Sequence, residues 1–360
     1  MSFAYFFEPN SILLISDDSE FEKEFLSTYK GKILTPEKGL KSKSDLMILN
    51  VESTKITNYL RKYGRMSRSI LIRGKIRKKD MKKIALWSKR NKIPVLNGDI
   101  FLPYLFSTIK CDFILKRGSV FVVTDSPQTS RFWLDYFSYE RIGIFSLFRI
   151  DSSLNLEELL KYLSKNKEIS LLLFDIEKGE YRKELSTMKV RKKAIFMGGN
   201  VNSLDEVKCF VYSTLLPPSE KKSVLFITNG YRYVGDLPLS QISSKLQKKV
   251  QKFTKRKIST NLIDVGTAAT SETIKKVIEI AKSEIGIFVT ILNPYVEELN
   301  EGIVYALAVL RENGIPIVAY VPGGRKSKEL RDRLLEFSIP SFGELGCLKR
   351  FLNFLGTDKV

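Results

Sequence analysis

Leu46-Met47-Ile48-Leu49-Asn50-Val51 is a short apolar run between polar segments, and it decides the fold class. Such runs are typical of strands that are buried on both faces of a parallel sheet. Similar runs flank it, separated by longer amphipathic stretches. The other predicted strands of this first series are Ser11–Ile15, Lys32–Leu34, Ser69–Ile72 and Pro94–Leu96. The alternation predicts βαβ units in one doubly wound domain.

Two further series of strands follow. The second contains Ser119–Val123, Ile142–Ile150, Ser170–Phe174 and Ala194–Met197. The third contains Val224–Ile227, Ile285–Ile291 and Pro316–Val321, and closes with a helix over Cys347–Leu355. Leucines from Leu156 to Leu163 fall on one helical face, and Pro217-Pro218 marks a linker. We predict three α/β domains with largely parallel sheets, at residues 1–112, 113–216 and 217–360.

The composition excludes several kinds of chemistry. The chain has 360 residues, of which 43% are hydrophobic, so it is long enough for two or three folded domains. It contains no histidine, which removes the commonest general base and the commonest transition-metal ligand. Cys111, Cys209 and Cys347 are widely separated, so we interpret them as core residues and expect no disulfide framework or metal site.

The chain carries a net charge of +20, from 60 Lys and Arg against 40 Asp and Glu. This excess favours partners rich in phosphate or partners with an acidic protein surface. The densest basic clusters are Arg73–Lys83, Arg182–Lys193 and Lys245–Lys257. Lys-rich and Glu-rich surfaces are also typical of proteins adapted to heat, so nucleic-acid binding and thermal adaptation both stay open.

The N-terminus, residues 1–10, lacks the basic region of a secretory signal. No apolar run approaches the roughly 20 residues that a membrane-spanning helix requires. We therefore expect a cytoplasmic protein without a membrane partner. The sequence leaves a homo-oligomer open.

A family resemblance rests on short segments that follow one another in the family's order. They are Phe6–Ile12, Tyr29–Ile33, Asp45–Val51, Asn91–Leu96, Val224–Gly230, Asn261–Val265 and Ile339–Phe342. Together they resemble the NDP-forming acyl-CoA synthetases and the α subunit of succinyl-CoA ligase. The resemblance implies a Rossmann-like CoA-binding domain followed by two flavodoxin-like ligase domains. It also implies a separate ATP-grasp β-type subunit as a partner, because this chain shows no such half.

The turns that bind CoA phosphates in that family are altered here. The first turn contains Ser16, Asp17 and Asp18. The carboxylates of the two aspartates suit a helix N-terminus as caps but repel a pyrophosphate. The family's next turn corresponds to Asn97-Gly98-Asp99, which we interpret as a flexible turn with one more negative charge. Both changes disfavour CoA binding, although CoA stays the one cofactor that the resemblance allows.

The loop of the second domain corresponds to Thr124–Ser130. Pro127 stands where the family has its turn glycine, and proline removes an amide donor and fixes φ. Ser126 and Thr129 are simpler to interpret as caps of the following helix. A phosphate-binding role for this loop is therefore not expected.

The catalytic segment departs furthest from the family. The strand Ala194–Met197 leads through Gly198-Gly199-Asn200 to a predicted helix over Ser203–Tyr212, so the loop that carries the family's phosphohistidine is missing. Glu177 matches the family's glutamate that contacts this histidine. In the third domain Thr228-Asn229-Gly230 keeps the start of a glycine-containing turn, but Tyr231-Arg232-Tyr233 replaces the small residues that follow.

Three functions are compatible with these features. The first is a non-catalytic relative of the synthetase α subunit, which binds, scaffolds or regulates. The second is a CoA- or acyl-CoA-binding subunit that works with a separate ATP-grasp chain, with a different nucleophile such as Glu177. The third is a basic protein that binds nucleic acid or the ribosome and uses the same scaffold.

Overall fold

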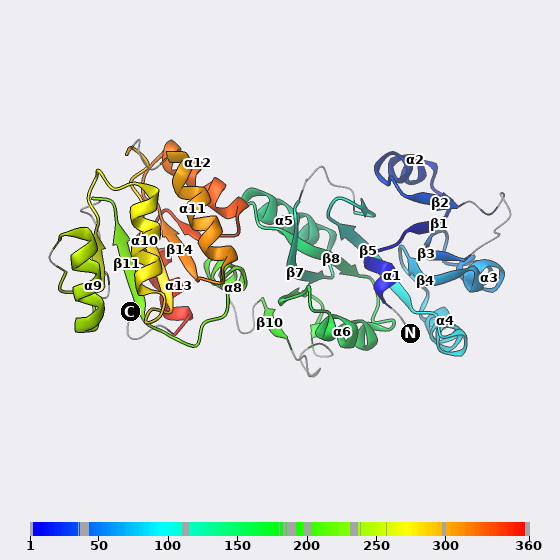
Figure 1. Cartoon of the computed structure of the whole chain (residues 1–360). Coiled ribbons are helices and arrows are strands. Elements are labelled where there is room, and N and C mark those ends of the chain that lie inside the picture. The colour runs from blue at the N-terminus through cyan, green and yellow to red at the C-terminus, as the bar shows by residue number, and fades with distance from the viewer. Residues whose placement is uncertain are drawn as a thin grey trace. The chain divides into compact units, whose positions relative to one another are not determined.

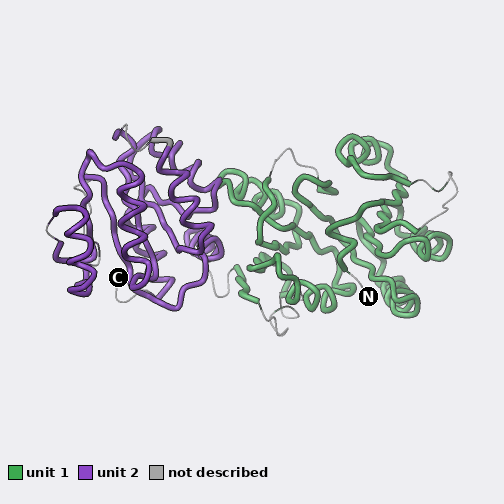
Figure 2. The backbone as a smooth tube through the Cα atoms, viewed as in Figure 1, with its two compact units in different colours: residues 1–202 green, residues 203–360 purple. Residues whose placement is uncertain are grey.

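The computed structural model describes residues 3–34, 36, 43–109, 115–179, 181–182, 185, 192–197, 203–230, 237, 239–256, 258–296 and 300–356. The chain divides into two compact units, residues 1–202 and 203–360 (Figures 1 and 2). Each unit has its own sheet and core.

Unit 1 is built on one mixed sheet. Its strands are β1 (Ser11–Ser16), β2 (Lys32–Leu34), β3 (Ser44–Asn50), β4 (Ser67–Ile72), β5 (Val95–Leu102), β6 (Phe106–Ser107), β7 (Arg117–Thr124), β8 (Ile144–Ile150), β9 (Leu171–Asp175) and β10 (Lys193–Phe196). Their order is β10-β9-β7-β8-β5-β4-β3-β1-β2, with β6 paired to β5. All pairs along this order are parallel except β5 with β8.

Helices cover both faces of this sheet. They are α1 (Ala4–Phe7), α2 (Ser19–Thr28), α3 (Ile56–Tyr63), the 3-10 turn η2 (Gly64–Met66), α4 (Lys78–Asn91), α5 (Pro127–Tyr139) and α6 (Leu156–Lys165). Because neighbouring residues of a strand point to opposite faces, Ile12 and Leu14 pack with α2, whereas Leu13 and Ile15 pack with α3 and α4. In α6, the four predicted leucines Leu156, Leu159, Leu160 and Leu163 are buried.

Unit 2 is a parallel five-stranded sheet with order β12-β11-β13-β14-β15. Its strands are β11 (Val224–Thr228), β12 (Leu262–Asp264), β13 (Ile287–Ile291), β14 (Ile317–Tyr320) and β15 (Ser341–Phe342). Its helices are α8 (Leu204–Leu215), α9 (Ser244–Thr254), α10 (Ser271–Ala281), α11 (Asn300–Glu312), α12 (Arg325–Glu336) and α13 (Leu345–Phe354). The predicted C-terminal helix is therefore present as α13.

The predicted fold class is confirmed, since both sheets are largely parallel and alternate with helices. One sheet contains strands from both sides of the domain boundary that the sequence places at residues 112 and 113, because β5 pairs with β8. Helix α8 packs within unit 2, where Phe210 meets Phe354 with ring centroids 4.5 Å apart. The three-domain division itself stays a prediction.

Within the described residues, none of the helices combines the length and apolar character needed to cross a membrane.

Candidate functional site

The first candidate turn connects β1 to α2. Asp18 is the N-cap of α2, and its Oδ1 accepts hydrogen bonds from the backbone N–H of Glu20 (3.0 Å) and Phe21 (3.1 Å). Ser16 Oγ bonds the backbone of Asp18 and also accepts from Asn50 Nδ2. The capping interpretation of Asp18 is therefore confirmed, and two amides of this helix end are already occupied.

Asp17 points to the neighbouring βα connection rather than to the helix. Its Oδ2 lies 3.0 Å from Lys55 Nζ, and this hydrogen bond raises the pKa of the Lys55 ammonium. The pair is solvent-exposed, so it contributes little to stability.

Asn97-Gly98-Asp99 does not form the predicted turn. All three residues lie inside β5, and Gly98 and Asp99 pair with Ile150 and Arg149 of β8. A β-carbon at position 98 would lie 1.8 Å from the Arg149 carbonyl oxygen, so only glycine allows this close approach. Asn97 Nδ2 donates to the carbonyl oxygens of Ile72 and Gly74, which ties β5 to the end of β4.

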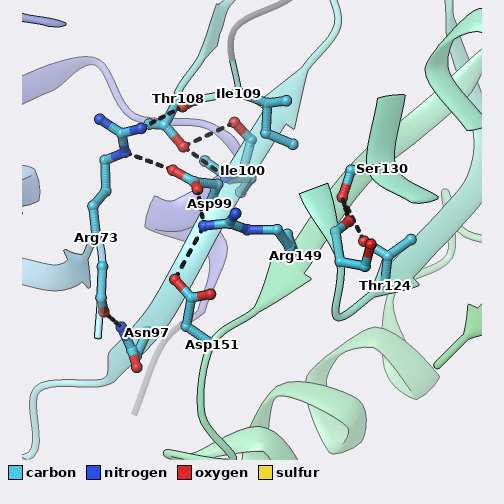
Figure 3. A network of polar contacts seen from close by, with 12 residues as sticks. Arg73, Asn97, Asp99, Ile100, Thr108, Ile109, Thr124, Ser130, Arg149 and Asp151 are labelled. Atoms are coloured by element: carbon cyan, nitrogen blue, oxygen red, sulfur yellow. Dashed lines mark hydrogen bonds and ion pairs between the residues drawn. The ribbon is translucent and has the colours of Figure 1, made fainter. Parts of the chain in front are cut away.

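The carboxylate of Asp99 is the centre of a polar network at the ends of the strands (Figure 3). Arg73 Nε lies 2.5 Å from Asp99 Oδ1, and Arg149 Nη2 pairs with Asp99 Oδ2. Arg149 Nη2 also lies 3.1 Å from Asp151 Oδ2, and Arg73 Nη2 donates to the Thr108 carbonyl oxygen (2.9 Å). The Asp99 side chain is only 7% exposed, so this carboxylate serves the two arginines and not the solvent. The sequence-based view of Asp99 as an added repulsive charge is therefore wrong.

A pocket of about 220 Å³ lies beside the network. Asp18, Glu20 and Glu24 of the α2 segment line it, together with Arg73, whose guanidinium stacks 3.9 Å from the Phe21 ring centroid. Among the described residues that line the pocket, Arg73 is the one cation and is already paired and stacked, whereas three lining residues are acidic. This lining does not fit the diphosphate of CoA, because the acidic residues repel it and the charge of Arg73 is already paired with Asp99.

Asp151 follows β8 directly and completes the network. Burial raises the pKa of the Asp151 carboxyl, and the nearby Arg149 opposes this shift. Tyr181 OH donates to the Asp151 backbone carbonyl at 3.0 Å. The network therefore links the carboxyl ends of β4 and β8 through the middle of β5.

The second candidate turn connects β7 to α5. Ser126 is the N-cap and accepts from the Thr129 amide at 3.3 Å, with Pro127 at the first helical position. The Thr124 and Ser130 hydroxyls lie 2.6 Å apart and are buried (Figure 3). The capping role predicted for Ser126 is confirmed, whereas Thr129 is not a cap.

Glu177 lies beside this turn. Its Oε1 accepts from Thr129 Oγ1 at 2.8 Å. The buried Asp125 carboxylate accepts from the backbone N–H of Glu177 (3.0 Å) and Lys178 (2.7 Å). An internal carboxylate thus takes two amides that lie at the carboxyl end of β9.

The third candidate turn is in unit 2. Thr228 ends β11 and pairs with Asp264 of β12, and Asn229 Oδ1 accepts from the Asn293 amide at 2.9 Å. Gly230 has φ +89°, and a β-carbon there would lie 2.6 Å from Thr267 Cγ2. These contacts make the turn a structural joint between neighbouring strands.

Gly198, Gly199 and Asn200 lie outside the described residues, as do Tyr231-Arg232-Tyr233 and Cys111. Among the residues that the structure does describe, no group of three or more acidic or cysteine side chains could hold a metal ion.

Sequence reasoning missed Arg73, Arg149 and Asp151 as members of this site. A signal was present, since Arg73 and Asp151 are charged residues directly after apolar strands, where ligands of parallel sheets bind. Their partner Asp99 could not be assigned without the β5–β8 pairing.

No protein-family model and no curated protein matches the chain. Three solved structures have similar folds. PH0766 from Pyrococcus horikoshii OT3 has a TM-score of 0.72 and 17% identity, covering 98% of this chain and 97% of that one. The dinucleotide-forming acetyl-coenzyme A synthetase 1 of Ca. Korarchaeum cryptofilum has a TM-score of 0.71 in its apo form and 0.70 with phosphate and ADP. Each form is 16% identical to this chain, and each match covers all of this chain. The matches cover 100% of the apo synthetase and 99% of the form with phosphate and ADP. The chain therefore has the fold of this acetyl-CoA synthetase.

Proposed function

We propose that this chain is a non-catalytic relative of the α-type half of NDP-forming acyl-CoA synthetases, which binds or scaffolds and transfers no phosphoryl group. The observation that carries the proposal is the Asp99 network, which occupies the two arginines at the ends of β4 and β8. A strand-end site for a diphosphate needs such cations and amides free to donate.

At the second turn, too, side chains of this protein occupy donors that a phosphate would need. Asp125 accepts from two backbone amides, and Ser126 accepts from a third as the cap of α5. The absence of histidine from all 360 residues removes the phosphorylated side chain itself. Each of these features removes a different requirement of phosphoryl transfer, so together they support a non-catalytic chain.

The alternative is a subunit that still binds CoA and works with an ATP-grasp partner. Phosphate and ADP are bound in one structure of the acetyl-CoA synthetase with this fold. For this chain the alternative requires a diphosphate to displace Asp99 from Arg73 or to bind among Asp18, Glu20 and Glu24. Both routes cost electrostatic free energy, so the non-catalytic proposal is favoured.

A labelling experiment tests the proposal. The purified chain is mixed with the ATP-grasp subunit of a two-subunit acetyl-CoA synthetase, Mg²⁺ and ATP labelled at the γ-phosphate. The α subunit native to that synthetase is the positive control and takes up label. We expect no label on this chain, and stable or acid-labile label on it would overturn the proposal.

A further inference from the structure

The basic residues are concentrated in one segment of unit 1. Residues 55–92 contain fifteen of the 60 Lys and Arg but only one of the 40 Asp and Glu, which is Asp80. The segment therefore holds +14 of the net charge of +20. It comprises α3, η2, β4 and α4, of which α3, β4 and α4 are labelled in Figure 1.

The two helices of this segment pack on the same face of the sheet. Ile56, Leu60 and Ile84 are fully buried in one core cluster, which directs the other sides of α3 and α4 outward. The exposed cations of the segment include Arg61, Lys62, Arg65, Arg68, Lys78, Lys79, Lys82, Lys83, Lys89, Arg90 and Lys92. We call this the α3–α4 basic surface.

A groove of about 290 Å³ lies between α3 and α4. Arg61, Lys83 and Arg90 line it, and so do the half-buried Trp87 and the 58% exposed Leu86. The Trp87 ring approaches Gly64 so closely that a β-carbon there would lie 2.5 Å from it. The groove thus combines an indole ring with three cations.

A second hollow, of about 570 Å³, adjoins the end of α4. Its lining includes Lys43, Arg65, Arg68 and Lys92. In the described part of the chain, Arg68 is the one of these four with a carboxylate partner, Asp45 at 3.5 Å. Arg65 Nε donates instead to the neutral Asn91 Oδ1 at 2.8 Å, and no carboxylate among the described residues pairs with its charge.

The two hollows are lined by residues that are close in the sequence. Arg90 lines the groove while Asn91 and Lys92 line the second hollow, and Arg61 and Arg65 are one helical turn apart. The cations therefore follow an extended path rather than one compact site. An extended row of cations fits a ligand with repeated phosphates.

We propose that the α3–α4 basic surface binds single-stranded nucleic acid. Arg61, Lys83 and Arg90 contact successive phosphates, and Trp87 offers its ring to an unpaired base. Thermal adaptation explains the surface less well, because it enriches cations together with acidic partners, whereas fifteen cations with one acid repel one another. An anionic membrane is flat, but the cations here line hollows.

This surface shares no lining residue with the pocket beside Asp99, so either proposal can fail while the other stands. The test uses the full chain and a fluorescein-labelled oligonucleotide of about 20 nucleotides, as RNA and as DNA of the same sequence. Anisotropy gives the affinity at two salt concentrations. Tryptophan emission gives a second readout, because the chain has two tryptophans and Trp133 is fully buried.

Two triple variants remove equal charge from exposed helical positions. R61Q/K83Q/R90Q changes the groove, and K245Q/K248Q/K249Q changes α9 of unit 2. We expect the groove variant to lose about tenfold in affinity at low salt. Its slope of log K against log salt should become shallower by about 2. The α9 variant should keep the wild-type affinity and the wild-type slope. Binding should quench wild-type emission, and Trp87→Phe should abolish that change.

Equal losses in both triple variants overturn the proposal, because they indicate a response to net charge alone. Tighter binding to vesicles with anionic lipid than to either oligonucleotide overturns it in favour of a membrane surface. Absence of binding at low salt overturns it outright. A preference between the RNA and DNA arms identifies which single strand the surface takes.

Discussion

Asp99 of β5 and Arg149 of β8 are directly opposite each other in the antiparallel pair of strands, and their side chains form an ion pair with low exposure. The same carboxylate also pairs with Arg73 at the end of β4. One carboxylate therefore bridges two arginines, and Asp151 supplies a second negative charge beside Arg149. The ends of β4 and β8 are linked through their own side chains at the place where this class of sheet binds ligands.

Removing the charge of Asp99 should strongly destabilise unit 1. Asp99→Asn leaves Arg73 and Arg149, which are 20% and 17% exposed, without their shared carboxylate. We expect a loss of about 3 kcal/mol in the free energy of unfolding, because an unpaired charge then stays largely buried. Urea denaturation measures it. Glu157→Gln, which breaks the exposed pair with Lys161, is the control and should change little.

A loss below that of a typical surface pair would contradict the structural role of Asp99. It would mean that solvent already compensates both arginines.

Asp18 should behave as a helix cap and not as a determinant of ligand binding. Asp18→Ala removes the acceptor for the Glu20 and Phe21 amides, so we expect a loss of about 1 kcal/mol in the free energy of unfolding. Asp18→Asn keeps a capping oxygen and should restore most of this loss. Thermal melts of both variants measure it, and equal losses in the two would disprove the cap.

Cys209 should be an unreactive thiol at neutral pH. Burial raises the pKa of the Cys209 thiol to about 11 from an ordinary value of 9.0. Iodoacetamide reacts with the thiolate, so at pH 8 the folded chain should be labelled there far more slowly than the chain in urea. Mass spectrometry resolves the site. Comparable rates in both states would exclude a buried thiol.

The same shift predicts the pH dependence of stability. The folded state binds the Cys209 proton more tightly than the unfolded state, so this contribution is complete below about pH 9 and is lost as pH rises toward 11. Cys209→Ala removes this contribution and is the control, so its pH dependence should be weaker than that of the wild type. Unfolding midpoints across this pH range measure it.

The sequence predicted the strands of both sheets where they are continuous apolar runs. Leu46–Val51 corresponds to β3, and Ile142–Ile150 contains β8. The run of leucines in α6 was also predicted correctly, because its period is local. Local patterns of this kind need no knowledge of distant partners.

The continuation of β5 through Asn97-Gly98-Asp99 was not predictable in this way. Asn, Gly and Asp are typical turn residues, and only pairing with β8, about fifty residues later, makes them a strand. The Asp99 network depends on this pairing, so the pairing of Asp99 with Arg73 and Arg149 was not predictable either. Two or three residues carry no period, so the short strands β6, β12 and β15 were missed, although the equally short β2 was predicted.

Calorimetric titration with CoA at low salt tests whether this chain has lost the family's CoA site. We expect no binding heat up to millimolar CoA, because Arg73 and Arg149 are held by Asp99 and the adjoining pocket is acidic. Saturable binding of one CoA per chain, with a dissociation constant in the micromolar range, would contradict it.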